Sequence, residues 1–180
     1  PKQMQYQPAD LYRALGLFLK AAAAPTLRNS ETYQYDLVDL ARQSLANYAR
    51  TAYANVVKAY EQKNAEQLQQ ATRRFEHLIA LQDSLLQTNR HFLLGNWLQQ
   101  ATQYAPNEAD RQLCVLNAQT LISYWGPDDP TTKVHDYANK EWAGMLSTYY
   151  LPRWQAFFRG LQATIGTGNP PAIDFFDMEK

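Results

Sequence analysis

The acidic pair Asp36 and Asp39 is the first place where residue type and spacing suggest chemistry. Residues three apart share one face of a helix, so the two carboxylates are expected side by side. Paired carboxylates occur in acid–base sites, but they are equally common on solvated faces. An ion pair with Arg28 or Arg42 is the other ordinary role. We expect one of these two structural roles for the pair.

The histidines are too scattered for the usual metal or catalytic patterns. Neither His-Glu-x-x-His nor the Glu-x-x-His of di-metal bundles occurs around His77, His91 or His135. The chain also has no nucleophile-elbow motif and no glycine-rich phosphate loop. We therefore expect no catalytic residue, no metal and no cofactor in this chain.

Trp125 is the residue best suited to contact a ligand. It ends a predicted helix directly before a Gly-Pro loop, where side chains are well placed to face a cleft. Its indole offers a flat apolar face and one N–H donor, which match a pyranose ring. Asp136, Tyr137 and Asn139 follow the loop and can hydrogen-bond hydroxyls or an acetamido group. The alternative is that Trp125 closes the end of a helical bundle.

The composition describes a single globular domain, or a domain with a short tail. The 180 residues are 46% hydrophobic, and 17 basic residues balance 17 acidic ones. Without a basic surplus we expect no nucleic-acid partner. No apolar run approaches the roughly 20 residues that span a bilayer. The one cysteine, Cys114, excludes an internal disulfide and fits a small buried hydrophobe better than a reactive thiol.

The elements that must position these residues all read as helices. Apolar residues recur at helical spacing over 8–24, 31–62, 64–88, 90–104, 108–124, 135–150 and 152–166, with Pro152 either kinking or starting the last one. No run alternates like a strand. We predict an all-α fold, a multi-helix bundle of about six to seven helices with short connections. The predicted division is an N-terminal helix and linker (1–29), the bundle (30–166) and an extended tail (167–180).

Two details of the long helices can be checked directly. Asn64 is a predicted N-cap with Gln67 as its partner. The buried face of the helix that follows is expected to hold these residues: Leu68, Phe75, Leu78, Ile79, Leu81, Leu85 and Leu86. In the tail, Ile173, Phe175 and Phe176 are expected to dock on the bundle.

Five segments resemble, in order, the C-terminal domain of α-N-acetylglucosaminidases, glycoside hydrolase family 89. They are Tyr35–Gln43 (YDLVDLARQ), Phe92–Leu98 (FLLGNWL), Asn117–Pro127 (NAQTLISYWGP), Asp136–Gly144 (DYANKEWAG) and Tyr149–Trp154 (YYLPRW). The resemblance covers roughly residues 30 to 165. The loop 128–135 departs from it, being longer than the usual spacer between W-G-P and D-Y-A-N. His135 in that loop is either a solvent-facing residue or a pH-sensitive contact at a pocket rim.

The resemblance implies a function that spacing alone does not. Family members combine a small N-terminal domain, a (β/α)₈-like barrel and this helical domain. They remove terminal α-linked N-acetylglucosamine from glycans with retention, using two barrel carboxylates about 5–5.5 Å apart. The helical domain closes one side of the sugar pocket, which carries over to Trp125 and Tyr137 here, with Asn139 as a further candidate. Arg153 is expected to be structural.

The resemblance also implies a partner and a location. The partner is the catalytic barrel of the same protein, and the location is secreted, periplasmic or lysosomal. The start at Pro1 rather than Met favours a fragment or a processed product. Alone, this chain is expected to be inactive and to expose an apolar docking face through which it could dimerise. A stand-alone helical module that binds a glycan or a protein, without catalysis, is the alternative, and a purely structural scaffold is a third possibility.

Overall fold

The computed structural model describes residues 5–123, 129, 131, 139–169 and 171–179. Its regular elements in that part of the chain are helical, which confirms the predicted all-α fold class. The chain divides into two compact units, an N-terminal unit (Pro1–His91) and a C-terminal unit (Phe92–Lys180). This division falls within the predicted 30–166 bundle, and the predicted domain boundaries stay a prediction. No described helix is both long enough and apolar enough to cross a membrane.

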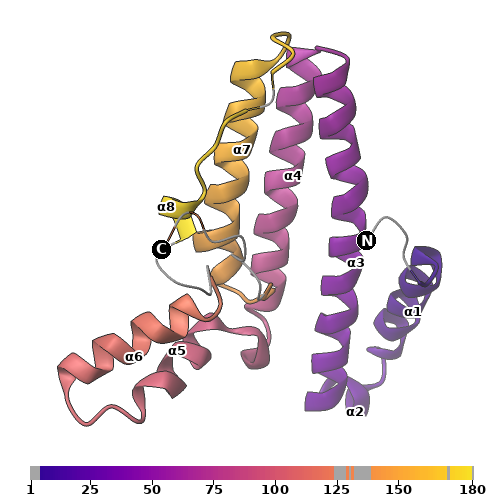
Figure 1. The fold of residues 1–180 in the computed structure, drawn as a ribbon. Coiled ribbons are helices and arrows are strands. Elements are labelled where there is room, and N and C mark those ends of the chain that lie inside the picture. Colours follow the sequence, from indigo (N-terminus) through magenta and orange to yellow (C-terminus); the bar gives the residue numbers. More distant parts are fainter. Residues whose placement is uncertain (1–4, 124–128, 130, 132–138, 170, 180) are drawn as a thin grey trace. The chain divides into compact units, whose positions relative to one another are not determined.

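The N-terminal unit is built on a long helical hairpin (Figure 1). Its helices are α1 (Pro8–Ala21), α2 (Pro25–Arg28), α3 (Glu31–Glu61) and α4 (Ala65–Leu86). α3 and α4 run antiparallel, and α1 lies along the first half of α3. Pro25 follows the predicted helix over 8–24 and begins the short α2. A proline suits the first helical position because its missing N–H has no partner there.

The turn between α3 and α4 satisfies the backbone groups at both helix ends. The Asn64 N–H donates to the Ala59 carbonyl at 3.0 Å and the Lys63 N–H to Tyr60 at 2.9 Å. This is the Schellman pattern, with Lys63 in the left-handed region at φ 54°. The Asn64 side chain then accepts from the Gln67 N–H at 3.0 Å. The predicted N-cap is therefore confirmed.

The hairpin core combines small residues of α3 with larger ones of α4. Val56 and Leu68 are fully buried, and Ala52 and Ala59 nearly so. Small residues allow close helix approach, so little space is left for solvent. Leu81 was predicted to be buried, but it is 43% exposed. It lies off the face on which the buried residues of α4 recur: Leu68, Thr72, Phe75, Leu78, Gln82, Asp83 and Leu86.

The C-terminal unit pairs short helices. They are α5 (Leu94–Thr102), α6 (Glu108–Thr120), the π-helical segment η2 (Leu146–Tyr150), α7 (Leu151–Thr164) and α8 (Phe176–Glu179). A 3₁₀ turn, η1 (Arg90–Phe92), precedes α5, so the helix predicted over about 90–104 is present but begins later, at Leu94. α5 and α6 form a second hairpin (Figure 1). Asn107 caps α6 because its side chain accepts from the Asp110 N–H at 3.0 Å.

The predicted helix over 135–150 is wrong for the first half of its described length, residues 139–144. Asn139 to Ala143 are not helical, and Gly144 has φ +91°. The backbone of Ala143 bonds instead to the 92–94 segment, so its amide and carbonyl are satisfied without a helix. Helix resumes at η2, and Pro152 lies in the first turn of α7. Pro152 has no N–H for the preceding turn, which fits a break in the α-helical ladder there.

Candidate functional site

Two of the three predicted pocket residues, Trp125 and Tyr137, lie outside the described residues. The third, Asn139, is described and exposed. His135 and Asp136 also fall outside the described part. The assignment of a sugar pocket to these residues therefore stays a prediction. The structure describes the segments of the C-terminal unit that precede and follow these residues in the chain.

The side following the predicted pocket is fixed by a backbone bridge. The Ala143 N–H donates to the Phe92 carbonyl at 2.7 Å, and the Leu94 N–H donates to the Ala143 carbonyl at 3.1 Å. Phe92 and Ala143 are both buried. A side chain added at Gly144 would be strained because of its positive φ. The segment that carries Asn139 is therefore anchored four residues further on.

Tyr150, in η2, adds a second and weaker anchor. The backbone N–H of Lys140 points to the Tyr150 hydroxyl at 3.4 Å. The Lys140 ammonium lies 5.8 Å from the centre of the Trp142 ring. π-Helical turns often occur at functional sites, and here η2 places Tyr150 next to the residue that follows Asn139. The sequence did not single out Tyr150 for this role.

The side preceding the predicted pocket is fixed by Trp97. Its indole N–H donates to the Ala118 carbonyl at 3.0 Å, near the end of α6. Its ring also packs against Trp142, with 5.9 Å between centroids. Trp97 therefore joins α5, the end of α6 and the 139–143 segment. Ile122 and Ser123 after α6 are buried, so the chain is packed up to the last described residue before Trp125.

Aromatic residues of α7 and the tail form the rest of the unit's core. Phe158 is 1% exposed and packs against Trp154 at 5.5 Å and Phe157 at 5.9 Å between ring centroids. The Arg153 guanidinium lies over the Tyr149 ring at 5.0 Å and the Phe175 ring at 5.4 Å. These contacts give Arg153 a structural environment.

The tail docks on α7, as predicted for Ile173 and Phe175. A Cβ built at Gly160 would lie 2.6 Å from the Pro171 Cβ and 3.1 Å from the Ile173 Cδ1. Only a glycine allows the Pro171 and Ile173 side chains to approach α7 this closely. Asn169 and residues 171–175 have no regular secondary structure, and the short α8 follows them.

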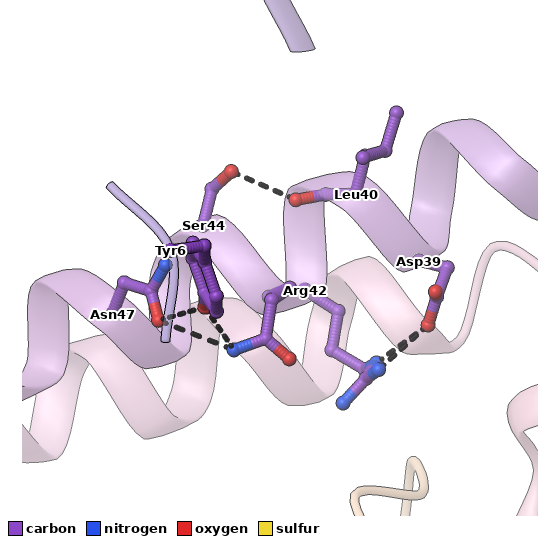
Figure 2. A network of polar contacts seen from close by, with 7 residues as sticks. Tyr6, Asp39, Leu40, Arg42, Ser44 and Asn47 are labelled. Carbon is purple, nitrogen blue, oxygen red and sulfur yellow. Dashed lines mark hydrogen bonds and ion pairs between the residues drawn. The ribbon is translucent and has the colours of Figure 1, made fainter. Parts of the chain in front are cut away.

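The acidic pair of α3 takes the structural role that the sequence favoured for it. Arg42 forms an ion pair with Asp39 at 2.6 Å (Figure 2). On the same helix the side-chain oxygen Oδ1 of Asn47 accepts from the Tyr6 hydroxyl at 2.9 Å, which fixes the segment before α1. Neither contact resembles a catalytic pair. Among the described residues no group of histidine, cysteine or acidic side chains could hold a metal ion.

A mixed-charge hollow of about 550 Å³ lies where α3 begins. Glu31 contacts Arg90, and the His91 Nε2 lies 3.4 Å from a Glu31 carboxylate oxygen. The hydrogen bond to His91, followed by the positive charge of Arg90, lowers the pKa of Glu31 below its ordinary value. The Tyr35 ring meets the His91 ring edge-on at 5.6 Å. These contacts connect the start of α3 with the residues that follow α4, and the charged side chains remain exposed to solvent.

Comparisons with known proteins agree on one family. The model of the α-N-acetylglucosaminidase (NAGLU) C-terminal domain matches residues 1–180. Human α-N-acetylglucosaminidase is 35% identical over 174 residues, which are 96% of this chain and 23% of the human protein.

Solved structures give the same result. A family 89 glycoside hydrolase from Clostridium perfringens, in complex with PUGNAc, is similar with a TM-score of 0.87 and 30% identity. The match covers 98% of this chain and 20% of that one. A second structure of the Clostridium perfringens protein, in complex with its substrate GlcNAc-α-1,4-galactose, matches with the same TM-score, identity and coverage. This chain thus spans about a fifth of the length of its relatives. It belongs to the α-N-acetylglucosaminidase C-terminal domain family.

Proposed function

We propose that this chain is the C-terminal domain of a retaining α-N-acetylglucosaminidase that removes terminal α-linked N-acetylglucosamine from glycans. The proposal rests on the alignment of this chain, at 35% identity and over nearly its whole length, with human α-N-acetylglucosaminidase. The Clostridium perfringens relative, with its GlcNAc-α-1,4-galactose substrate, supports the same glycan class. The barrel that carries the catalytic carboxylates is the proposed partner within the full-length protein.

In this proposal the chain forms one wall of the sugar pocket. Trp125 stacks on the apolar face of the pyranose ring, while Tyr137 and Asn139 hydrogen-bond its polar rim. The anchored segments on either side support this role, because a binding group must be held by rigid neighbours. Trp97 fixes the end of α6 before Trp125. The Ala143 bridge fixes the chain after Asn139.

The test is hydrolysis of GlcNAc-α-1,4-galactose by the full-length protein and by this chain alone. The proposal expects turnover by the full-length protein and none by the isolated chain. Proton NMR during the first minutes should show the α-anomer of N-acetylglucosamine first, since a retaining enzyme acts through two displacements. Release of the β-anomer first would refute retention, and a full-length protein without turnover would refute the activity.

Titration of the isolated chain with the same glycan separates the proposal from a stand-alone binding module. A single wall of a pocket makes few contacts, so the proposal expects binding no tighter than about millimolar. Clearly tighter binding by the isolated chain would favour the module instead. The secreted, periplasmic or lysosomal location stays a prediction from the family resemblance.

A further inference from the structure

Helix α1 carries an apolar stripe that its own unit leaves uncovered. Ala9, Tyr12, Gly16 and Leu19 recur at intervals of three, four and three, which places them on one face of the helix. Tyr12 is 42% exposed and Leu19 is 57% exposed. We call these four residues the outer stripe of α1. Tyr12 and Leu19 are its two large apolar side chains, and apolar residues gathered in one exposed stripe mark an interaction surface more often than single ones do.

The remaining sides of α1 pack on α3 or carry charged residues together with the exposed Leu17. Leu11, Leu15 and Phe18 are half-buried, and the Phe18 ring stacks on Tyr33 of α3 at 5.5 Å with an interplanar angle of 5°. The charged side carries the Asp10–Arg13 ion pair at 2.7 Å. Even so, not one residue of this 14-residue helix is buried. A helix this short depends on tertiary packing for its stability, so a second packing layer is expected.

Gly16 shows that the space above the stripe is open. A Cβ built at Gly16 would meet nothing within 4 Å. Its φ also lies outside the left-handed range that favours glycine, so nothing in the described structure requires a glycine here. A glycine weakens the interior of a helix. Close approach of a partner between Tyr12 and Leu19 gives a reason for its presence, since a side chain at this point would keep the partner away.

We propose that the outer stripe of α1 docks against the part of the full-length protein that precedes residue 1. This inference rests on the proposed function. The chain matches a C-terminal domain and spans 20–23% of its relatives, so the remainder of such a protein lies mainly before it. α1 begins at Pro8, and seven extended residues reach at most about 25 Å. A partner held by so short a tether has a high effective concentration, which favours it over a second copy.

The test uses the full-length protein with a protease site introduced within residues 1–4. After cleavage, size-exclusion chromatography measures whether the two pieces remain together. Leu19→Glu places a charge in the stripe, and Leu17→Glu is the matched control. Leu17 is as exposed, at 61%, but lies beside Asp10 and Arg13 on the charged side. We expect the wild type and Leu17→Glu to co-elute, and Leu19→Glu to dissociate at concentrations at least tenfold higher.

Three results would overturn the proposal. In the first, the cleaved pieces of the Leu19→Glu and Leu17→Glu proteins remain associated to the same extent. In the second, the pieces of both proteins dissociate to the same extent. The third is loss of a concentration-dependent dimer in Leu19→Glu while the cleaved pieces stay together, which would assign the stripe to a second copy. If circular dichroism shows that Leu19→Glu is unfolded, Gly16→Leu replaces it. The unit itself has room for that side chain, so it should fold and still weaken association.

The association measurement does not depend on catalysis. Hydrolysis of GlcNAc-α-1,4-galactose is measured on the same uncleaved samples. A full-length protein without turnover whose pieces part only in Leu19→Glu would refute the proposed function and keep the docking surface. An active protein whose pieces stay associated with either substitution would keep the proposed function and refute the docking surface.

Discussion

Trp97→Phe is the substitution whose effect can be worked out most fully from the structure. Phenylalanine keeps an aromatic ring beside Trp142 but removes the N–H that donates to the Ala118 carbonyl at 3.0 Å. Ala118 is 4% exposed and lies in the last turn of α6, where carbonyls lack intrahelical partners. The next amide that could reach it, that of Ile122, donates to Gln119 instead. The substitution therefore leaves a buried acceptor without its donor.

The expected cost follows from that geometry. An unsatisfied buried acceptor costs about 1–3 kcal/mol. For a chain of this length each kcal/mol lowers Tm by about 2–4 °C, so Tm should fall by about 2–12 °C. Thermal unfolding of this chain followed by circular dichroism measures the change. The control is Tyr104→Phe, which removes a hydroxyl from a side chain that is 86% exposed. It should change stability by no more than about 0.5 kcal/mol.

A Tm of the Trp97→Phe protein within about 1 °C of the control would refute the reasoning. It would mean that the Ala118 carbonyl finds water or another donor. In the full-length protein the same substitution should also lower kcat/KM on the glycan, because the end of α6 leads directly to the proposed pocket residue Trp125. A loss of stability with unchanged kcat/KM would separate the structural role of Trp97 from the proposed site.

Three further results are expected. Gly160→Val should displace the tail from α7, because even a Cβ there meets Pro171 at 2.6 Å, and chymotrypsin should then cut after Phe175 faster than in the wild type. Glu31→Gln removes a carboxylate whose pKa is lowered in the folded state. The carboxylate therefore stabilises the fold above its ordinary pKa of 4.5, and this stabilisation is lost as pH falls through the lower pKa of the folded state. The Tm difference between variant and wild type should shrink over that range, and an unchanged difference would contradict the ion-pair assignment. Leu68→Ala should cost about 2–5 kcal/mol in urea unfolding because Leu68 is fully buried, and a cost below 1 kcal/mol would contradict the hairpin core.

The helices of this chain could be predicted because their signals are local. The apolar spacing of residues 31–62 and the cap at Asn64 each depend on residues within a few positions of one another. Local signals of this kind also place the charged and apolar sides of α1. The error at Leu81 came from counting every leucine toward the core rather than following one face of the helix.

The segment around Asn139 could not be predicted in the same way. Its apolar and aromatic residues suggest a helix, but the backbone of Ala143 pairs with Leu93, some fifty residues earlier. Such a long-range bond leaves no local pattern, and it overrides helix propensity. The indole bond from Trp97 to Ala118 is also long-range. Family segments marked the residues of the candidate site, while the contacts that hold the neighbouring backbone became visible only in the structure.

The proposed role of this domain is to supply an aromatic wall to a pocket whose catalytic groups lie elsewhere in the protein. The most direct measurement is kcat/KM for GlcNAc-α-1,4-galactose in full-length protein carrying Trp125→Ala, with Trp125→Phe as the control that keeps a stacking face. Loss of stacking worth about 1–3 kcal/mol predicts a decrease of about 5- to 150-fold for alanine and a smaller one for phenylalanine, at unchanged Tm. Alanine-substituted protein with wild-type kcat/KM would contradict the account.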